Sequence, residues 1–370
     1  MQSWLCVDRV FWLADLFDYL NWRGDLSFTQ VPPNAVDALV FSALSYMDFE
    51  GIVPADDAHS TPLHIAATVL AGLADPQSRI RLKSDLALLQ AAAETPRFRS
   101  TRLAFYRSKL IPEEETQFAA VTFLLEDGTA FLAFRGTDST LVGWKEDFNM
   151  SFQNTVPAQR EALAYTKEFA AAMPVVLRLG GHSKGGNLAV FSAAKAPVNL
   201  QKRILEVFNL DGPGFTGYLM GDEGYIRMVP KIRTYIPESS IIGMLLEHEE
   251  PYTVIKSRQV GPLQHELYSW EVMAGSFITK EEISSGNRFI DRTIKNWIAD
   301  MRPEERSAFV EALYDLVRSG GANNVGDLLQ PKNIQAIFQK LNTSEQTRRL
   351  LSGELVEFLK AAAGTLFERT

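Results

Sequence analysis

The chain is poor in the residues that build disulfides, metal sites and nucleic-acid surfaces. Cys6 is the only cysteine among 370 residues, so an intrachain disulfide, a CxxC redox pair and a cysteine-based zinc site are excluded. Acidic residues outnumber basic ones by 45 to 37, which argues against a nucleic-acid binder because phosphate neutralisation needs clustered Lys and Arg. We therefore expect a reducing, cytoplasmic setting and no nucleic-acid partner.

Long apolar runs are also missing. No uncharged run of about 18 apolar residues occurs, so the sequence predicts no transmembrane segment. The aromatic opening MQSWLCVDRVFWLADLFDYL contains Asp8, Arg9, Asp15 and Asp18, and it lacks the basic start and small-residue cleavage site of a signal peptide. We interpret it as an amphipathic entry helix whose aromatic side chains pack inside; a lipid-facing surface is the alternative.

The hydrophobic pattern divides the chain into three zones. Apolar residues recur at helical spacing up to about Arg107, notably over residues 36–47 and 63–89, and again after Lys280, over 289–298 and 309–317. The sequence therefore predicts an N-terminal helical region packing on the core (1–107), a core (108–280) and a C-terminal helical accessory region (281–370).

Strand and helix patterns alternate in the central zone. Two apolar runs flank Asp127-Gly128, a dipeptide typical of a tight hairpin turn. Helices are then expected over 159–172 and 186–196. Further strands are expected at residues 175–179, 204–210, 231–237 and 252–257. This alternation predicts an α/β fold with a mostly parallel central sheet flanked by helices.

A serine lies between glycines directly after one of these strands. Gly181-His182-Ser183-Lys184-Gly185 fits the G-x-S-x-G pattern in its strand–turn–helix context, which is typical of a nucleophile elbow. The Lys184 N–H, at the start of the helix, is expected to face a developing oxyanion. A purely structural glycine turn and a phosphate cradle are the alternatives, but the P-loop pattern is absent.

A serine nucleophile needs a histidine base. His59 and His64 precede the serine, contrary to the order serine, acid, histidine that α/β-hydrolases use. His182 adjoins the serine and is poorly placed to face its hydroxyl. His265 follows a predicted strand and precedes the aromatic turn LYSW, so we favour it over His248, which we expect to be exposed in the charged segment LLEHEEP.

Two carboxylates are candidates for the acid that orients the base. Asp211 ends the predicted strand VFNLD after the nucleophile helix, at the sheet edge where sites of α/β proteins gather. Glu238 follows the next strand and is the alternative. We favour Asp211, although an aspartate before glycine is also a common turn residue.

Two family resemblances support this interpretation. The segment from Phe134 to Thr137, FRGT, followed by GWKED at 143–147, resembles the class 3 lipases, which have an α/β-hydrolase fold. That resemblance implies that the Thr137 N–H completes the oxyanion hole with Lys184, and that Arg135 is structural. The class 3 acid lies in a later turn, which here corresponds to residues 240–243 and lacks an aspartate. The segment NLDGPG instead resembles pancreatic-type lipases, in favour of Asp211.

A larger set of motifs resembles a bacterial lipase-like family of the Mbeg type, whose function is poorly defined. They are DYLNWRGDLSF, LSYMDFEGI, GGHSKGGNLA, NLDGPGF, IPESSIIGMLLEHEE and QHELYSWEV. The resemblance covers residues 18–272 and extends into the helical tail. It implies an α/β-hydrolase fold with N-terminal and C-terminal helical additions.

These observations predict a serine hydrolase of the lipase or esterase type that acts on a small-molecule ester or lipid-like substrate. No cofactor or metal is implied. The apolar run at 241–246 suggests that Met244, Leu245 and Leu246 line an acyl pocket, with a buried helix as an equal alternative. A thioesterase or amidase with the same triad stays open, as does a non-catalytic lipase-fold protein that binds an acyl ligand or a protein partner.

Overall fold

The computed structural model describes residues 14–56, 59–137, 146, 149–150, 153–240 and 242–281. The chain divides into two compact units, residues 1–136 with 154–295 and residues 137–153 with 296–370, and almost all described residues belong to the first. The helices expected at 289–298 and 309–317 lie outside the described residues. The three-region division stays a prediction.

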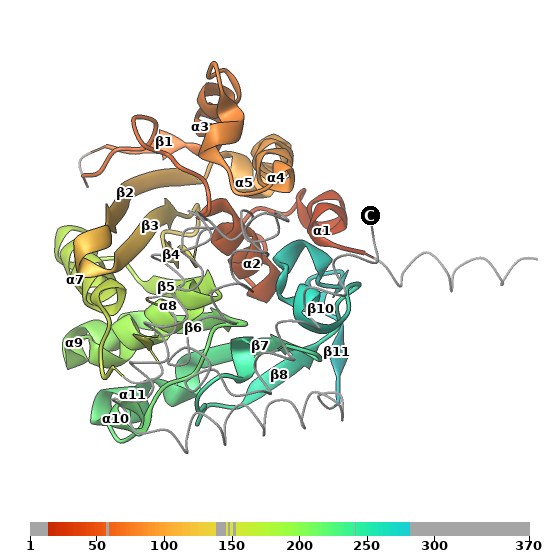
Figure 1. The fold of residues 1–370 in the computed structure, drawn as a ribbon. Coiled ribbons are helices and arrows are strands. Elements are labelled where there is room, and N and C mark those ends of the chain that lie inside the picture. Colours follow the sequence, from red (N-terminus) through yellow and green to blue (C-terminus); the bar gives the residue numbers. More distant parts are fainter. Residues whose placement is uncertain are drawn as a thin grey trace, which may run out of the picture. The chain divides into compact units, whose positions relative to one another are not determined.

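Among the described residues, nine strands form one sheet in the order β1-β2-β3-β4-β5-β6-β7-β8-β11 (Figure 1). A separate hairpin joins β9 (Val272–Met273) to β10 (Ser276–Phe277). The strands of the sheet are β1 (Thr61–Pro62), β2 (Arg102–Ile111), β3 (Thr116–Leu124), β4 (Ala130–Phe134), β5 (Leu177–His182), β6 (Ile204–Leu210), β7 (Ile232–Pro237), β8 (Tyr252–Ile255) and β11 (Thr279–Lys280).

The sheet is mixed, so the prediction of a mostly parallel sheet holds for only part of it. Neighbouring strands are parallel from β4 to β8 and antiparallel from β1 to β4 and between β8 and β11. The hairpin expected around Asp127-Gly128 is present as β3 and β4. The pattern missed most of β2 because residues 102–107 were included in the helical zone, and this strand adds a long antiparallel pairing with β3.

Ten α-helices are described, and short 3₁₀ turns join several of them. The α-helices are α1 (Leu16–Arg23), α2 (Ala35–Leu44), α3 (Leu63–Ala71), α4 (Lys83–Glu94), α5 (Pro96–Arg99), α7 (Pro157–Ala172), α8 (Lys184–Lys195), α9 (Val198–Gln201), α10 (Gly217–Met220) and α11 (Glu223–Met228). The 3₁₀ turns are η2 (Pro76–Arg79), η3 (Pro112–Glu114), η4 (Val229–Lys231), η5 (Ile242–Met244), η6 (Gly261–His265) and η7 (Leu267–Ser269). No described helix is long and apolar enough to cross a membrane.

Local sequence explains where several helices begin and end. The side chains of Asp15 and Asn34 accept backbone N–H groups in the first turns of α1 and α2, which satisfies donors that a helix leaves unpaired. The single helical pattern predicted over 63–89 is interrupted after Gly72, which caps α3. Asp75 and Pro76 then start η2 before α4 begins.

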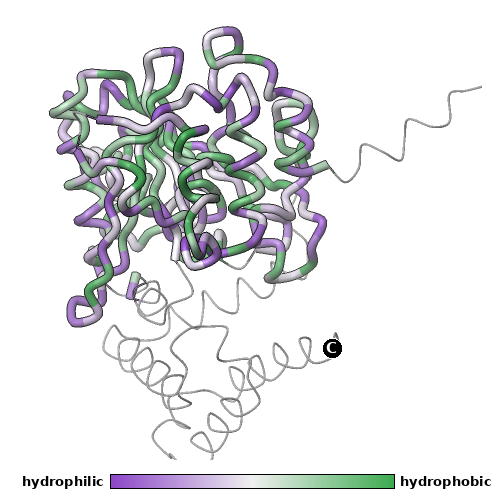
Figure 2. The backbone as a smooth tube through the Cα atoms, turned by 90° about the horizontal axis from the view of Figure 1, so that it is seen from above, coloured by the Kyte–Doolittle hydropathy of each residue, from purple (hydrophilic) through white to green (hydrophobic). Residues whose placement is uncertain are grey.

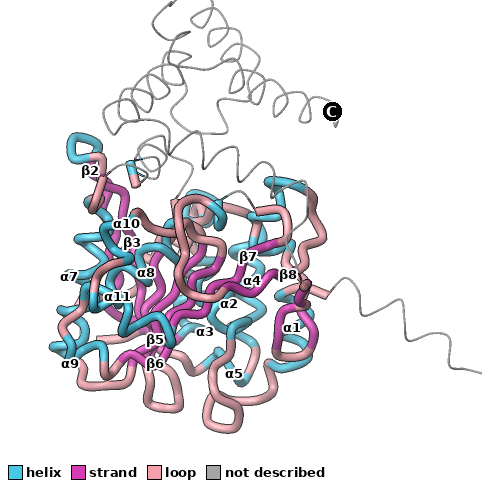
Figure 3. The backbone as a smooth tube through the Cα atoms, turned by 90° about the horizontal axis from the view of Figure 1, so that it is seen from below, coloured by secondary structure: helices cyan, strands magenta, loops and turns pink. Residues whose placement is uncertain are grey.

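Helices cover both faces of the sheet, and alternation along the strands explains why both faces are apolar. On β3, Val121 and Phe123 join the apolar cluster on the side of α1 to α4, whereas Phe118 and Ala120 join the cluster on the side of α7, α8 and α11 (Figures 1 and 3). Figure 2 shows hydrophobic segments gathered in the interior and hydrophilic stretches mostly at the outer turns. The strands therefore lie between two helical layers.

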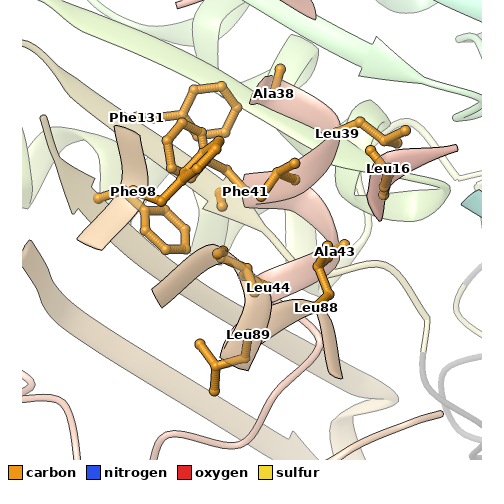
Figure 4. Packing of buried hydrophobic residues seen from close by; sticks show 14 of the residues in the cluster. Leu16, Ala38, Leu39, Phe41, Ala43, Leu44, Leu88, Leu89, Phe98 and Phe131 are labelled. Carbon is orange, nitrogen blue, oxygen red and sulfur yellow. The ribbon is translucent and has the colours of Figure 1, made fainter. Parts of the chain in front are cut away.

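The N-terminal helices are built into the core of the first unit. Phe41 of α2 lies in contact with Phe98, Phe123 and Phe131, at ring-centroid distances of 5.5, 4.7 and 5.0 Å (Figure 4). A fully buried ion pair lies in the same layer, where Nε and Nη2 of Arg97 bind both carboxylate oxygens of Asp37. Packing against β3 and β4 makes this layer part of the sheet's hydrophobic core, and the ion pair joins α2 to α5 within the layer.

Candidate active site

The serine turn begins at the end of β5 and opens α8. Ser183 has φ 59° and ψ −133°, a backbone conformation that non-glycine residues adopt only under strain. Its N–H donates to the Leu210 carbonyl at the end of β6, at 3.0 Å. A Cβ atom at Gly185 would lie 2.1 Å from the Phe134 carbonyl oxygen, so the helix can approach β4 only without a side chain there. Packing of backbone on backbone therefore holds the strained serine.

Asp211 lies at the end of β6, beside this turn. Its side chain is fully buried, its φ is 55°, and its N–H donates to the Tyr235 carbonyl of β7 at 2.9 Å. Asn209 accepts the Gly212 N–H, and Asn187 of α8 donates to the Pro213 and Gly214 carbonyls. The turn after Asp211 is thus fixed on both sides.

His265 links the serine to the aspartate. Its Nδ1 lies 2.7 Å from Oδ2 of Asp211, and its Nε2 lies 3.0 Å from Oγ of Ser183. A carboxylate only accepts, so the proton between His265 and Asp211 belongs to Nδ1, and Nε2 is left to accept the serine hydroxyl proton. The three side chains favoured by chain order form one hydrogen-bonded row.

Burial is graded along this row. The carboxylate of Asp211 is fully buried, whereas the imidazole of His265 is 27% exposed. Oδ1 of Asp211 has no hydrogen-bond partner among the described residues. Because a buried carboxylate needs a partner, His265 is the group that compensates its charge, and a positive imidazolium would do so best.

The loop that carries His265 is held by its neighbours. The indole N–H of Trp270, which is fully buried, donates to the Gln264 carbonyl at 2.9 Å. The Gln264 side chain accepts the Ser239 N–H and donates to the Gln259 carbonyl. The aromatic turn after the histidine therefore fixes the backbone on which the base is mounted.

The two alternative residues make other contacts. Glu238 is paired with Lys280 instead of a histidine. His248, expected to be exposed, has a side chain only 5% exposed, because Nδ1 binds buried Glu250 at 3.0 Å and Nε2 donates to the Gly243 carbonyl at 2.8 Å. The prediction was wrong because the segment is rich in charged residues, and the sequence does not show that Glu250 points inward and binds His248.

The remaining predicted residues stay predictions. Lys184 is the first residue of α8, as expected, and its buried ammonium donates to the carbonyl and side-chain oxygens of Gln117. Thr137 begins the second compact unit, so its proposed part in the oxyanion hole is untested. Met244, Leu245 and Leu246 are half-buried, in η5 and the turn that follows it.

A further set of polar contacts around His265 was not predicted from the sequence. Tyr46 and His182 are hydrogen-bonded to each other, and His182 also binds the His265 carbonyl. Arg81 forms a double hydrogen bond with Glu266. Tyr46 and Arg81 come from the N-terminal helical region, and no local motif marks either residue as a neighbour of the serine turn.

Among the described residues, no group of three or more His, Cys, Asp or Glu side chains is arranged to hold a metal ion. A family model described as Mbeg1-like matches residues 92–315. The chain belongs to this family. The Mbeg1-like segment contains Ser183, Asp211 and His265, whereas Tyr46 and Arg81 precede it.

Comparison with curated proteins gave no match. Among solved structures, the native Rhizomucor miehei lipase propeptide complex is similar to this Mbeg1-like chain at 15% sequence identity and a TM-score of 0.35. The match covers 59% of this chain and 67% of the other. A similarity this weak carries no weight for fold or function.

Proposed function

We propose that this Mbeg1-like protein is a serine hydrolase with an α/β-hydrolase fold that cleaves a carboxylic ester through an acyl-enzyme. The observation that carries the proposal is the row of hydrogen bonds from Asp211 through His265 to Ser183, at 2.7 and 3.0 Å. A strained serine at a strand-to-helix turn supports it, because such a turn exposes a nucleophile beside the start of a helix.

The proposed reaction uses these residues in sequence. Ser183 attacks the ester carbonyl while Nε2 of His265 accepts its proton, and buried Asp211 stabilises the resulting imidazolium. The N–H groups of Lys184 and Thr137 would bind the oxyanion. His265 then returns the proton to the leaving alcohol, and water activated by the same histidine hydrolyses the acyl-enzyme.

The substrate is proposed from the run beside the site. Met244, Leu245 and Leu246 would contact the acyl chain of a small-molecule ester or lipid-like substrate, because they follow Gly243, which lies directly against Asp211. Thioester or amide cleavage with the same triad is the second candidate. A binding protein without turnover is the third; it would have no need of the hydrogen bond from the serine to a histidine base.

The test is steady-state hydrolysis of matched acyl substrates by the wild type and Ser183→Ala. We expect the wild type to cleave p-nitrophenyl esters, with rates on the corresponding thioester and anilide reporting the preferred bond. Ser183→Ala should lose about 10³-fold or more, since removal of a triad nucleophile leaves only oxyanion binding and positioning. Equal rates for the two proteins on all three substrates would overturn the proposal.

A further inference from the structure

A second histidine lies directly behind His265. The side chain of His182 is buried, and its ring centroid lies 4.5 Å from that of His265, with the ring planes inclined by 33°. Its Nε2 is 2.8 Å from the His265 carbonyl oxygen, and its Nδ1 is 3.0 Å from the Tyr46 hydroxyl. A carbonyl oxygen only accepts, so Nε2 carries the proton and Tyr46 donates to Nδ1. Both nitrogens of a neutral His182 are therefore satisfied.

The surroundings favour this neutral form. Burial lowers the pKa of His182 well below its usual range, and the nearby His265 and Arg81 lower it further. The acidic groups near Tyr46 are Glu266 and Asp85, and Glu266 is paired with Arg81. A neutral His182 therefore places no positive charge beside the ring of His265, whose centroid lies 4.5 Å away and on which the proposed imidazolium forms.

The N-terminal helical region also contacts Glu266, the residue after His265. The guanidinium of Arg81 binds both carboxylate oxygens of Glu266, at 2.9 and 3.0 Å, and lies 4.5 Å from the centre of the Tyr46 ring. Space for the Tyr46 hydroxyl depends on Gly136, where a Cβ atom would lie 2.1 Å from it. From the N-terminal helical region, Arg81 thus holds Glu266 directly, and Tyr46 acts on His265 through His182 of β5.

We propose that His182 and Tyr46 are positioning residues that fix the backbone of His265, so that its Nε2 stays within hydrogen-bond distance of Ser183. This inference rests on the proposed function. Small displacements of a base from its nucleophile lower the rate strongly, and groups that hold such residues are therefore part of the site's design. The N-terminal region would then contribute to catalysis without touching the substrate.

The test compares labelling rates with a fluorophosphonate probe in Tyr46→Phe, His182→Met and His182→Gln. We expect a fall of about 10-fold for Tyr46→Phe, from the loss of one buried hydrogen bond, and a larger fall, on the order of 100-fold, for His182→Met. His182→Gln keeps a donor for the His265 carbonyl and should recover most of the rate. Tyr165→Phe is the matched control. It removes another buried tyrosine hydroxyl, which is hydrogen-bonded to Thr122, and Tyr165 belongs to the apolar cluster on the other face of the sheet.

A second readout separates positioning from stability. The His265 Nδ1 proton, bonded to Asp211 at 2.7 Å, should give a low-field ¹H NMR resonance that Asp211→Asn removes. We expect this resonance to shift or broaden in Tyr46→Phe and His182→Met but not in Tyr165→Phe, where only folding stability changes. His182→Gln and Tyr46→Phe decide the matter if His182→Met does not fold.

Two results would overturn the inference in distinguishable ways. If the wild type is labelled, but Tyr46→Phe and His182→Met react as fast as Tyr165→Phe with an unmoved resonance, His182 and Tyr46 are only core residues. If the wild type is not labelled at all, the proposed function fails and this inference fails with it.

Discussion

Asp211 is the residue on which the assignment of the acid depends. It is fully buried and bound to Nδ1 of His265, whereas Glu238 is paired with Lys280. Asp211→Asn can no longer stabilise an imidazolium and can hold the ring in the wrong tautomer. We expect fluorophosphonate labelling to slow by about 10⁴-fold, the loss typical of this substitution in a catalytic triad. Glu238→Gln is the control and should react like the wild type; the reverse order would assign the acid to Glu238.

Gly243 illustrates how closely Asp211 is enclosed. A Cβ atom at this position would lie 2.2 Å from Oδ1 of Asp211. No side chain therefore fits at Gly243 unless Asp211 is displaced.

Gly243→Ala should therefore displace the aspartate and slow labelling by roughly 10-fold or more, since misplacement of a triad partner by about 1 Å is costly. Gly221→Ala is the matched control, because its Cβ would meet no atom within 4 Å. If Gly243→Ala and Gly221→Ala are labelled at the same rate, the close contact between Gly243 and Asp211 has no role in the reactivity of Ser183.

At the scale of elements, the sequence pattern found the strands and helices with strong periodicity and missed those that depend on distant partners. Asp127-Gly128 and the apolar runs beside it specify their own hairpin. By contrast, β5 continues through Gly181 and His182, where no apolar pattern exists, because its ladder to β6 supplies the pairing.

The residues of the candidate site differ in the same way: some are marked by a local pattern, and others depend on contacts between distant segments. Ser183, Asp211 and His265, which the structure brings within hydrogen-bond distance, could be singled out because each follows a recognisable strand in a known chain order. Tyr46 lies in the motif LSYMDFEGI, but no local pattern shows that its partner is His182, 136 positions away. The partner of His248 was missed for a related reason, because charge in a sequence does not say which side chains point inward.

The serine turn gives an element-scale prediction. A methyl group at Gly185 would lie 2.1 Å from a backbone oxygen of β4, which cannot move aside as a flexible side chain can. Gly185→Ala should therefore lower the free energy of unfolding by about 1–3 kcal/mol, although alanine is the better helix former.

Urea denaturation measures this change. Gly217→Ala in α10 is the matched control, since its Cβ would meet nothing within 4 Å, and it should be neutral or slightly stabilising. Equal free energies of unfolding for Gly185→Ala and the wild type would contradict the close packing of α8 against β4.

At the scale of the whole molecule, the buried histidine beside the site couples folding to pH. The pKa of His182 is lowered well below its usual range by burial, so the folded protein leaves it neutral where the unfolded chain, with a pKa near 6.5, binds a proton. Stability must then fall as the pH decreases below about 6.5, by up to about 1.4 kcal/mol per pH unit, until the lowered pKa is reached.

His182→Gln should remove this contribution. We expect the difference in unfolding free energy between pH 6.5 and pH 5.5, measured in urea, to be smaller in the variant by about 1 kcal/mol. Parallel curves of unfolding free energy against pH for the wild type and His182→Gln would contradict a neutral buried His182.

Glu250 affects stability in a different pH range. Burial favours its protonation, but hydrogen bonds from His248, Tyr225 and Thr234 outweigh burial and lower its pKa. Its contribution to the free energy of unfolding is therefore lost only at more acidic pH.

The most direct test of the central claim is the intact mass of the wild type and Ser183→Ala after reaction with a fluorophosphonate probe. We predict a single adduct on the wild type and none on Ser183→Ala, because only a serine activated by His265 attacks the probe's phosphorus at a useful rate. An unmodified wild type, or equal labelling of both proteins, would contradict the account of Ser183 as an activated nucleophile.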